Sequence, residues 1–438
     1  MPAQHNPSSA ADPALPILVA DPSPPSALDH RVIGREMGIY TTHPLAGAGL
    51  PLWLPAGAVV RYELEQYARE IALATGCSPV YSPVLGKRAL FERSGHWAKF
   101  ADDMFPPMPV GGDELVLRPA NCPHHAMIYA AEIRSHRDLP IRLNELAPMF
   151  RAERSGVLSG LSRVRQIDLD DTHVFCRPDQ VAAEVAAALQ ALLDAYAVLG
   201  ISVDHLRLSR RGSGDGYLGA PEHWAAAEDR LRAALVAIDL PRRRLHSREV
   251  AGEAAFYGPK IDVQVLDVRG QVETLGTVQL DFNQPERFDL RYTDVDGARP
   301  LVSMIHRGTL GAMERMVALL LEVHRGRLPI WLAPVHVCLL PVTAAHRVAA
   351  ERAANLLRSN GVRLHLETEG SLGSRIRAAR GRRDSLLVVV GDQEVAAGAM
   401  SVHDPATDVR VRLPAAVLAE RISAAIRLRA LRVDLGAA

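Results

Sequence analysis

The segment 117–176 constrains the fold most strongly, because it combines two strand patterns with a connecting loop rich in arginine and glycine. Residues 143–153 have the composition of a strand, and side chains alternate again over residues 163–173. The loop between the two patterns contains Gly156 and Gly160. This arrangement predicts a β-hairpin with a long polar tip. Arginines on such a tip are suited to bind the phosphates of a nucleotide.

Length, charge and cysteine content limit the classes of protein that fit. A chain of 438 residues can form two or three domains. Lys+Arg and Asp+Glu number 50 each, so the bulk charge does not indicate nucleic-acid binding, although local basic patches could still bind RNA. The 4 cysteines are scattered and do not form a disulfide framework. With no secretory leader and no run of about 18 apolar residues, we expect a soluble cytoplasmic protein without a membrane segment.

Composition and periodicity divide the chain into three parts. Residues 1–27 are rich in Pro, Ala and Ser and are expected to form a disordered tail. Residues 28–330 mix helix and strand patterns, whereas in residues 331–438 strands alternate with helices, as in a compact and mostly parallel α/β unit. The expected helices cover 59–76, 178–199, 344–360 and 372–382, and the expected strands cover 78–84, 206–209, 335–340, 363–367 and 386–391.

Taken singly, the candidate functional residues also have ordinary interpretations. Cys122, His173 and His306 are about 50 and 130 residues apart, so no short spacing pattern indicates a metal site. Each could be a buried thiol or a core or surface histidine. A lone His96 beside Trp97 is more often packed or on the surface than functional, and most isolated arginines are solvated surface charges.

Two short segments carry a resemblance to a known family. Phe150-Arg151-Ala152-Glu153 and Gly311-Ala312-Met313-Glu314-Arg315 resemble motifs 2 and 3 of class II aminoacyl-tRNA synthetases. From about Leu28 onward the chain resembles the threonyl-tRNA synthetase family in particular. The resemblance implies an α+β class II catalytic domain, with an antiparallel sheet flanked by helices, followed by an α/β anticodon-binding-like domain. It also implies a homodimer, in which the 59–84 helix and strand would form the interface; an ordinary helix–strand pair is the alternative.

The resemblance implies a threonine–tRNA ligase. Such an enzyme uses ATP to convert L-threonine to threonyl-adenylate and then transfers threonine to tRNA(Thr). The family's zinc ligands match Cys122, His173 and His306, which would leave an open position for the amino and hydroxyl groups of threonine. Asp171 would accept a hydrogen bond from the hydroxyl group. Valine lacks that group and should be rejected, whereas serine should be rejected poorly.

The resemblance also assigns roles to residues around ATP, threonine and tRNA. Arg151 would bridge the threonine carboxylate and the α-phosphate, and Glu153 would bind the adenine amino group. Mg²⁺ would accompany ATP, bound mainly by phosphate oxygens and water. The remaining implied residues are Arg163 and Arg315 for ATP, His96 for aminoacyl transfer, Tyr257, Thr277 and Gln279 for the amino-acid pocket, and Lys260 and Glu394 for tRNA.

Several positions depart from the family pattern. Ile167 replaces the aromatic residue that stacks on adenine, and loss of stacking area or of a hydrogen bond at such a position would weaken binding by about 1–3 kcal/mol. His403 replaces an arginine that reads the anticodon, which puts tRNA recognition in question. The other departures are His124 at a glycine position, Leu169 and Thr274 at glutamine positions and Ala312 at a serine position.

These departures leave two further hypotheses open. The chain could adenylate threonine or a related β-hydroxy amino acid and pass it to a non-tRNA acceptor such as a carrier protein. It could instead be a regulatory or RNA-binding paralogue, which the retained Arg151, Glu153 and Arg315 argue against. The chain begins directly at the catalytic domain, so we expect a short form without the N-terminal editing domains of bacterial relatives.

Overall fold

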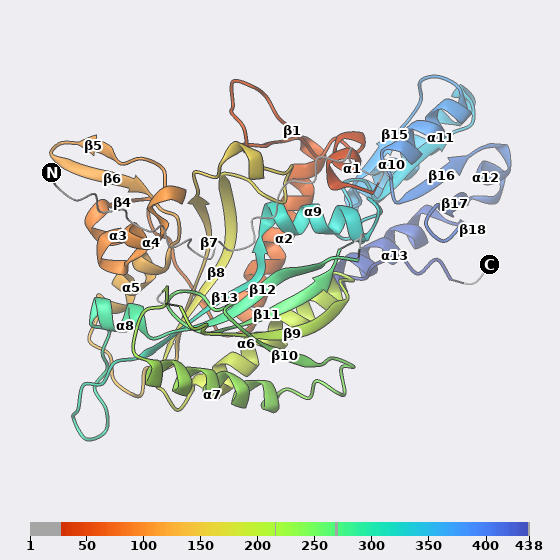
Figure 1. Ribbon diagram of the computed structural model, residues 1–438. Coiled ribbons are helices and arrows are strands. Elements are labelled where there is room, and N and C mark those ends of the chain that lie inside the picture. Colours follow the sequence, from red (N-terminus) through yellow and green to blue (C-terminus); the bar gives the residue numbers. More distant parts are fainter. Residues whose placement is uncertain (1–27, 215, 268–269, 437–438) are drawn as a thin grey trace.

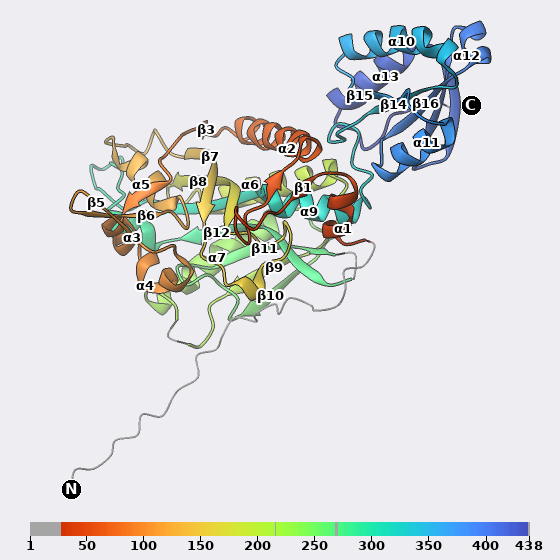
Figure 2. The ribbon, with the colours of Figure 1, turned by 90° about the horizontal axis from the view of Figure 1, so that it is seen from above.

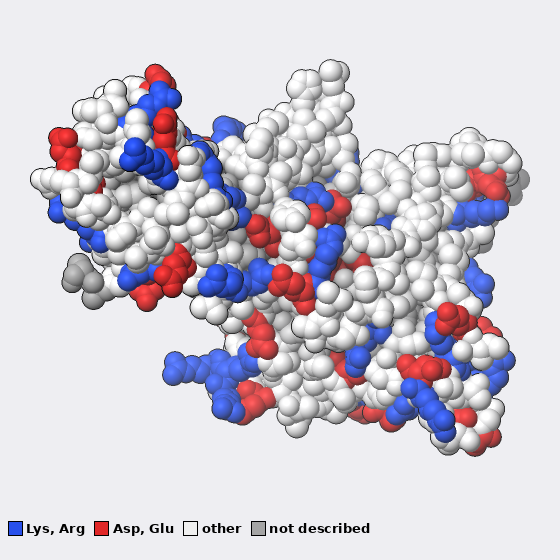
Figure 3. All heavy atoms as spheres, turned by 180° about the vertical axis from the view of Figure 1, so that it is seen from behind, with Lys and Arg blue, Asp and Glu red and all other residues white. Residues whose placement is uncertain are grey.

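A computed structural model describes residues 28–214, 216–267 and 270–436. The tail expected over residues 1–27 lies outside the described residues. Figure 1 shows a large mixed α/β body followed by a smaller one, and Figure 2 shows the smaller body beside the end of α2 (Pro55–Ala74). Charged side chains of both signs are intermixed on the face seen in Figure 3, in keeping with their equal numbers.

An eight-stranded sheet forms the centre of the larger body. Its strand order is β10-β9-β11-β12-β13-β8-β7-β3. The six central strands are antiparallel to one another, whereas the edge strands β10 and β3 pair in parallel with β9 and β7. The strands are β3 (Ser78–Pro79), β7 (Ile141–Phe150), β8 (Gln166–Cys176), β9 (Val203–Arg210), β10 (Ser247–Ala251), β11 (Lys260–Leu266), β12 (Val272–Asp281) and β13 (Ser303–Ala312).

Helices bury the apolar side of this sheet. Buried side chains of α6 (Val181–Val198), among them Val185, Leu189 and Leu192, belong to the same core as Ile305 of β13. α7 (Pro221–Ala237) packs on α6, and α9 (Met313–Val323) packs on β8 and β13. By length and composition alone α6 could span a membrane, but its buried face belongs to the core, so this is weak evidence of a membrane segment. The opposite sheet face carries the polar residues described below.

Smaller elements surround the central sheet. A three-stranded sheet, which the sequence patterns did not reveal, joins β4 (Leu85–Lys87), β5 (Met108–Val110) and β6 (Asp113–Leu117). The remaining elements of this body are α1 (His30–Glu36), β1 (Tyr40–Thr41), β2 (Leu52–Trp53), α3 (Arg88–Ser94), α4 (His96–Phe100), α5 (Cys122–Ala130) and α8 (Asn283–Phe288).

The smaller body contains a five-stranded sheet in the order β15-β14-β16-β17-β18. The first three strands are parallel, and β17 and β18 continue the sheet antiparallel. Its elements are β14 (Val337–Pro341), α10 (Arg347–Ser359), β15 (Leu364–Leu366), α11 (Leu372–Gly381), β16 (Leu386–Val390), α12 (Asp392–Ala397), β17 (Met400–Asp404), β18 (Val409–Leu413) and α13 (Ala415–Arg427). An ion pair between Arg363 Nη1 and Glu63 Oε1, 2.6 Å apart, joins this body to α2.

The predicted hairpin, helices and alternating C-terminal elements are confirmed, with shifted ends. The strand expected over 78–84 is wrong in extent, since only Ser78 and Pro79 form β3. Pro83 has no backbone N–H group and cannot continue a sheet ladder. The C-terminal sheet is mixed, because β17 pairs antiparallel with β16 and a tight turn then returns β18 antiparallel to β17.

Candidate active site and metal centre

The side chains of Cys122, His173 and His306 meet in three dimensions. Cys122 begins α5, whereas β8 and β13 supply the two histidines. The two histidines are direct cross-strand partners, so their rings project from the same sheet face. One ligand atom from each residue lies within 4.8 Å of the other two; Cys122 and His173 are buried, and the His306 side chain is 12% exposed. The strand register thus brings together residues that are distant in sequence.

Hydrogen bonds fix the orientation of both imidazole rings. His306 Nε2 lies 3.0 Å from Asp281 Oδ2, and a carboxylate can only accept, so this nitrogen donates. His173 Nδ1 lies 2.8 Å from His125 Nδ1, and His125 Nε2 lies 3.3 Å from Glu145 Oε2. Donation from His125 to Glu145 leaves His125 Nδ1 as the acceptor for His173. The other ring nitrogens of His173 and His306 face each other 3.0 Å apart.

This donor set fits a zinc ion. One sulfur and two imidazole nitrogens are typical zinc ligands, and three protein ligands leave a coordination position open. The hydrogen bonds from the outer nitrogens to His125 and Asp281 are those expected around metal-binding histidines. Burial raises the pKa of the Cys122 thiol and lowers the pKa of His173 well below its usual range. A divalent cation would favour the thiolate and the neutral imidazoles.

Three residues of the expected amino-acid pocket surround these ligands. Gln279 of β12 is the cross-strand partner of His306, and its side-chain oxygen accepts a hydrogen bond from the Tyr257 hydroxyl group. The Tyr257 ring stacks on His306, with centroids 5.2 Å apart. Gln279 Nε2 donates to Thr277 Oγ1 at 3.3 Å. The structure therefore brings Tyr257, Thr277 and Gln279 together beside the candidate metal ligands.

Asp171 and His96 are also close to the ligands. Asp171 Oδ1 lies 3.9 Å from His173 Nε2, and desolvation raises the pKa of this carboxyl to about 6. His96 Nε2 lies 3.8 Å from Cys122 Sγ, and its Nδ1 lies 2.8 Å from Ser94 Oγ. Burial lowers the pKa of His96 to about 4, so the ring is neutral near pH 7. A neutral ring can accept or donate a proton beside the pocket.

The two expected tRNA residues lie in different bodies. Lys260 is the cross-strand partner of Gln279, and its Nζ lies 3.0 Å from Asp262. Glu394 lies in the smaller body, where its carboxylate accepts the Gly391 backbone N–H at 3.0 Å at the start of α12. The structure brings Lys260 into the site and leaves Glu394 outside it.

Arginines gather near the tip of the β7–β8 hairpin. Arg151 follows β7 directly, and its buried Nε has no hydrogen-bond partner among the described residues. Arg163 Nη2 forms an ion pair with Glu153 at 2.8 Å. Arg315, near the start of α9, has an exposed side chain, yet desolvation of its guanidinium, together with Arg151 and Arg163, lowers its pKa from the ordinary value. Three cations around one carboxylate are suited to bind a polyphosphate.

Three departures from the family pattern, at Ile167, Leu169 and Ala312, lie toward this end of the hairpin. Ala312, the residue before α9, is the cross-strand partner of Leu169, so two apolar side chains meet there. Ile167 is paired with Met149 in the hairpin. Thr274 Oγ1 already accepts a hydrogen bond from Gln264 Nε2 at 2.9 Å. These contacts fill positions where stacking or amide contacts were expected.

Sequence reasoning did not single out Asp281, His125 and Glu145 as site residues. Asp281 follows Gln279 by two residues and therefore projects from the same strand face, so strand alternation could have identified it. The buried Glu145 also pairs with Arg118 at 3.2 Å. No sequence signal connects His125 to His173, because their contact depends on where α5 lies on the sheet.

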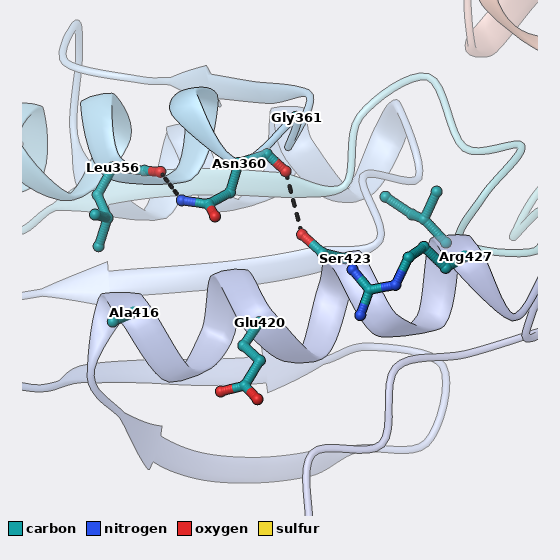
Figure 4. A pocket seen from close by; sticks show the side chains of 8 residues that line it. Leu356, Asn360, Gly361, Ala416, Glu420, Ser423 and Arg427 are labelled. Atoms are coloured by element: carbon teal, nitrogen blue, oxygen red, sulfur yellow. Dashed lines mark hydrogen bonds between the residues drawn. The ribbon is translucent and has the colours of Figure 1, made fainter.

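A surface pocket lies away from this site, between α10 and α13 (Figure 4). Ser423 Oγ donates to the Asn360 carbonyl oxygen at 3.1 Å across it. Its charged lining residues are Glu420 and Arg427. None of the expected site residues lines this pocket.

Two family models match the chain. Residues 109–324 match the class II core domain of tRNA synthetases (G, H, P, S and T), and residues 336–425 match an anticodon binding domain. A solved structure described as the RNA binding domain of threonyl-tRNA synthetase from Cryptosporidium parvum is 32% identical, with a TM-score of 0.83, and the match covers 90% of this chain and 98% of that chain. The chain belongs to the threonyl-tRNA synthetase family. The predicted α+β catalytic fold and anticodon-binding-like domain are thereby confirmed.

Other members of the threonyl-tRNA synthetase family are similar over most of this chain. Threonine–tRNA ligase of Bacillus velezensis is 45% identical over 380 residues, which are 86% of this chain and 58% of that protein. A solved structure described as a putative threonyl-tRNA synthetase from Aeropyrum pernix is 27% identical, with a TM-score of 0.79, and covers 92% of this chain and 97% of that chain. The chain thus spans somewhat over half the length of the curated relatives it matches.

Proposed function

We propose that this protein is a threonine–tRNA ligase that activates L-threonine with ATP and transfers it to tRNA(Thr). The observation that carries the proposal is the convergence of Cys122, His173 and His306 beside Asp171 and Gln279. Zinc bound by the first three residues would supply a Lewis acid that recognises the amino and hydroxyl groups of threonine. Valine lacks the hydroxyl and would leave buried polar groups unpaired.

The remaining steps depend on side chains of this chain. Asp171 accepts a hydrogen bond from the threonine hydroxyl, and Gln279 with Tyr257 limits the pocket. The threonine carboxylate attacks the α-phosphate of Mg²⁺-bound ATP and pyrophosphate leaves. The Arg151 guanidinium holds the carboxylate and stabilises the charge that builds on the phosphate. Glu153 binds adenine, and Arg163 and Arg315 hold the outer phosphates. His96 then assists transfer of threonine to the terminal ribose of the tRNA, and Lys260 contacts the end of the tRNA.

Threonine-dependent ATP–pyrophosphate exchange on zinc-loaded protein tests the activation step, with tRNA omitted. Exchange is expected with threonine, more weakly with serine and not with valine. The variant Asp171→Asn should lose most of the preference for threonine, whereas Asp179→Asn, which removes an exposed carboxylate beside Arg177, should keep it. Equal exchange with threonine and valine, or none with any of the three, would rule out the proposed activation.

One observation favours a different acceptor. The strand face where the family has an arginine carries His403, whose Nε2 lies 2.7 Å from Asp408 Oδ1. Asp408 also pairs with Arg410 at 3.2 Å, so this face presents a neutralised cluster rather than free cations. A carrier protein or small molecule could then replace tRNA as acceptor of the activated amino acid. Filter binding and charging with tRNA(Thr) separate the two acceptors, because charging requires that tRNA bind and accept threonine.

We further propose that the protein is a homodimer in the cytoplasm. Tyr62 and Leu73 on α2 are 59% and 61% exposed, and Tyr81, after the edge strand β3, is 85% exposed. Large apolar side chains beside an edge strand favour burial against a second copy of the chain. Sedimentation equilibrium of the wild type and of Tyr62→Glu tests this proposal: the variant should be shifted toward monomer. A monomeric wild type would refute the proposal.

We place the division between the two domains near residue 330. α9 ends at Val323 and β14 begins at Val337, and the intervening segment belongs to neither sheet. Leu328, Trp331 and Leu332 in this segment are buried, so limited proteolysis should cut at the exposed Arg325 if the two domains are independent folding units.

A further inference from the structure

Arg61 connects three elements of the catalytic domain. From α2 its Nη2 reaches Asp168 Oδ2 of β8 at 2.8 Å, and its Nη1 reaches Glu314 Oε1 at the start of α9 at 3.4 Å. Glu314 Oε2 accepts the backbone N–H of Asp168 at 3.0 Å. Asp168 and Glu314 are only 8% and 2% exposed. One guanidinium therefore joins α2, β8 and α9 in a nearly buried cluster.

The cluster contains more negative than positive charge. Burial, followed by the neighbouring Asp168 carboxylate, raises the pKa of Glu314 to about 8. The raised pKa favours the protonated form of Glu314, which leaves Asp168 as the buried carboxylate that Arg61 balances. The other charged group in contact is Glu65 on α2, whose Oε1 accepts from Arg61 Nε at 2.7 Å. Loss of Arg61 would leave a buried carboxylate without a counter-ion.

Two residues next to this cluster in the sequence belong to the expected ATP site. Arg315 follows Glu314 directly, and Ile167 precedes Asp168 at the position of the adenine-stacking residue. We propose that Arg61 is a positioning residue for ATP, which it does not itself touch. Arg61 holds the start of β8 and the start of α9 together. Ile167 and Arg315 can then contact the same nucleotide. The inference rests on the proposed function and deepens it.

The test compares nucleotide and amino-acid parameters of the full-length, zinc-loaded protein. Arg61→Met should raise KM for ATP in threonine-dependent exchange about tenfold or more, because displacement of a positioned group has a large effect. KM for threonine should change less than about twofold, since the candidate metal ligands and Gln279 lie outside the cluster. Arg61→Lys keeps the charge but cannot span both carboxylates, so it should give a smaller rise.

A double variant and a matched control distinguish positioning from packing. The double variant Arg61→Met/Asp168→Asn should recover most of the ATP affinity that Arg61→Met loses, because Asp168 no longer leaves an unpaired buried carboxylate. Glu65→Gln removes only the contact within α2 and should behave as wild type. Unchanged KM for ATP in Arg61→Met, a parallel rise in both KM values, or no recovery in the double variant would overturn the inference.

Direct ATP binding by calorimetry makes the result independent of the amino-acid substrate. The ATP affinities should follow the order of the KM values: wild type and Glu65→Gln bind ATP most tightly, the double variant less tightly, and Arg61→Met least tightly. If wild type binds ATP but exchanges none of the tested amino acids, the proposed activity fails and the calorimetric order still decides the role of Arg61. If wild type binds no ATP, both proposals fail.

Discussion

Asp281→Asn should weaken zinc binding without removing a ligand. One carboxylate oxygen of Asp281 accepts the His306 Nε2–H at 3.0 Å, and the other accepts the backbone N–H groups of Asn283 and Gln284 at 2.7 and 2.9 Å. An asparagine has one accepting oxygen and one donating NH₂ group, so it cannot satisfy both sides. If the NH₂ group faces His306, the ring loses its acceptor or moves its proton to the nitrogen that faces the metal site.

The size of this effect follows from the hydrogen bond that is removed. A hydrogen bond to a buried charged group is worth about 1.5–3 kcal/mol, and Asp281 is fully buried. That range corresponds to roughly a 10- to 150-fold increase in the zinc dissociation constant, in line with the loss of about 10–100-fold typical of such partners. Competition with a chromophoric chelator measures the constant, and the visible spectrum of the cobalt-substituted protein reports the coordination.

Asp262→Asn provides the matched control. Asp262 is equally buried on the neighbouring strand, but its carboxylate contacts Arg207, Ser209 and Lys260 and none of the candidate ligands. Loss of a buried carboxylate alone would affect both variants, whereas the proposed role predicts weaker zinc binding in Asp281→Asn only. A dissociation constant of Asp281→Asn similar to that of wild type would refute the assignment of Asp281 as the partner of a metal ligand.

Three further predictions use the same structure. His125→Leu removes the hydrogen-bond partner of the β8 ligand and should weaken zinc binding about 10–100-fold in the chelator assay, whereas the adjacent buried His124→Ala should not. Gly160 has a φ of +48°, and a Cβ there would lie 2.3 Å from His30 Nε2, so Gly160→Ala should displace the hairpin tip and raise KM for ATP in the exchange assay; an unchanged KM would show that the tip can shift freely. Burial lowers the pKa of His336 to about 3. Between about pH 6.5 and pH 3, this histidine therefore binds a proton in the unfolded chain but not in the folded one. The stability from the neutral ring is complete above that window and is lost as pH falls: urea unfolding should show a loss of about 2 kcal/mol from pH 7.5 to pH 5, which His336→Gln should lack if the ring is its source.

Local patterns were sufficient to predict most elements of the fold. The strand alternation around the hairpin and the periodicity of the helices survive in β7, β8, α2 and α6, because each of these elements buries one face against the core. The small sheet of β4, β5 and β6 could not be predicted in this way. Its strands have 3, 3 and 5 residues and are largely exposed, so they leave no periodic signal.

The site was predictable where a family motif marked the residue. Cys122, His173 and His306 come together only through the register of β8 with β13 and the position of α5, which no spacing in the chain reveals. Asp281 could have been found from strand alternation alone. His125 and the Arg61 cluster required the tertiary structure, because each depends on a contact between an element of the sheet and a helix.

The retained ligand candidate and the departure at residue 167 lie at different ends of β8: His173 belongs to the amino-acid side, whereas Ile167, six residues earlier, lies near the hairpin tip on the nucleotide side. On the amino-acid side, the candidate ligands are supported by two buried carboxylates, Asp281 directly and Glu145 through His125. On the nucleotide side, Ile167 takes the place of the adenine-stacking residue. Selection for a particular amino acid depends on the first side, and nucleotide affinity depends on the second. Exchange assays should therefore find a sharp preference for threonine over valine together with a KM for ATP that Ile167→Phe lowers. If Ile167→Phe leaves that KM unchanged, residue 167 does not contact adenine.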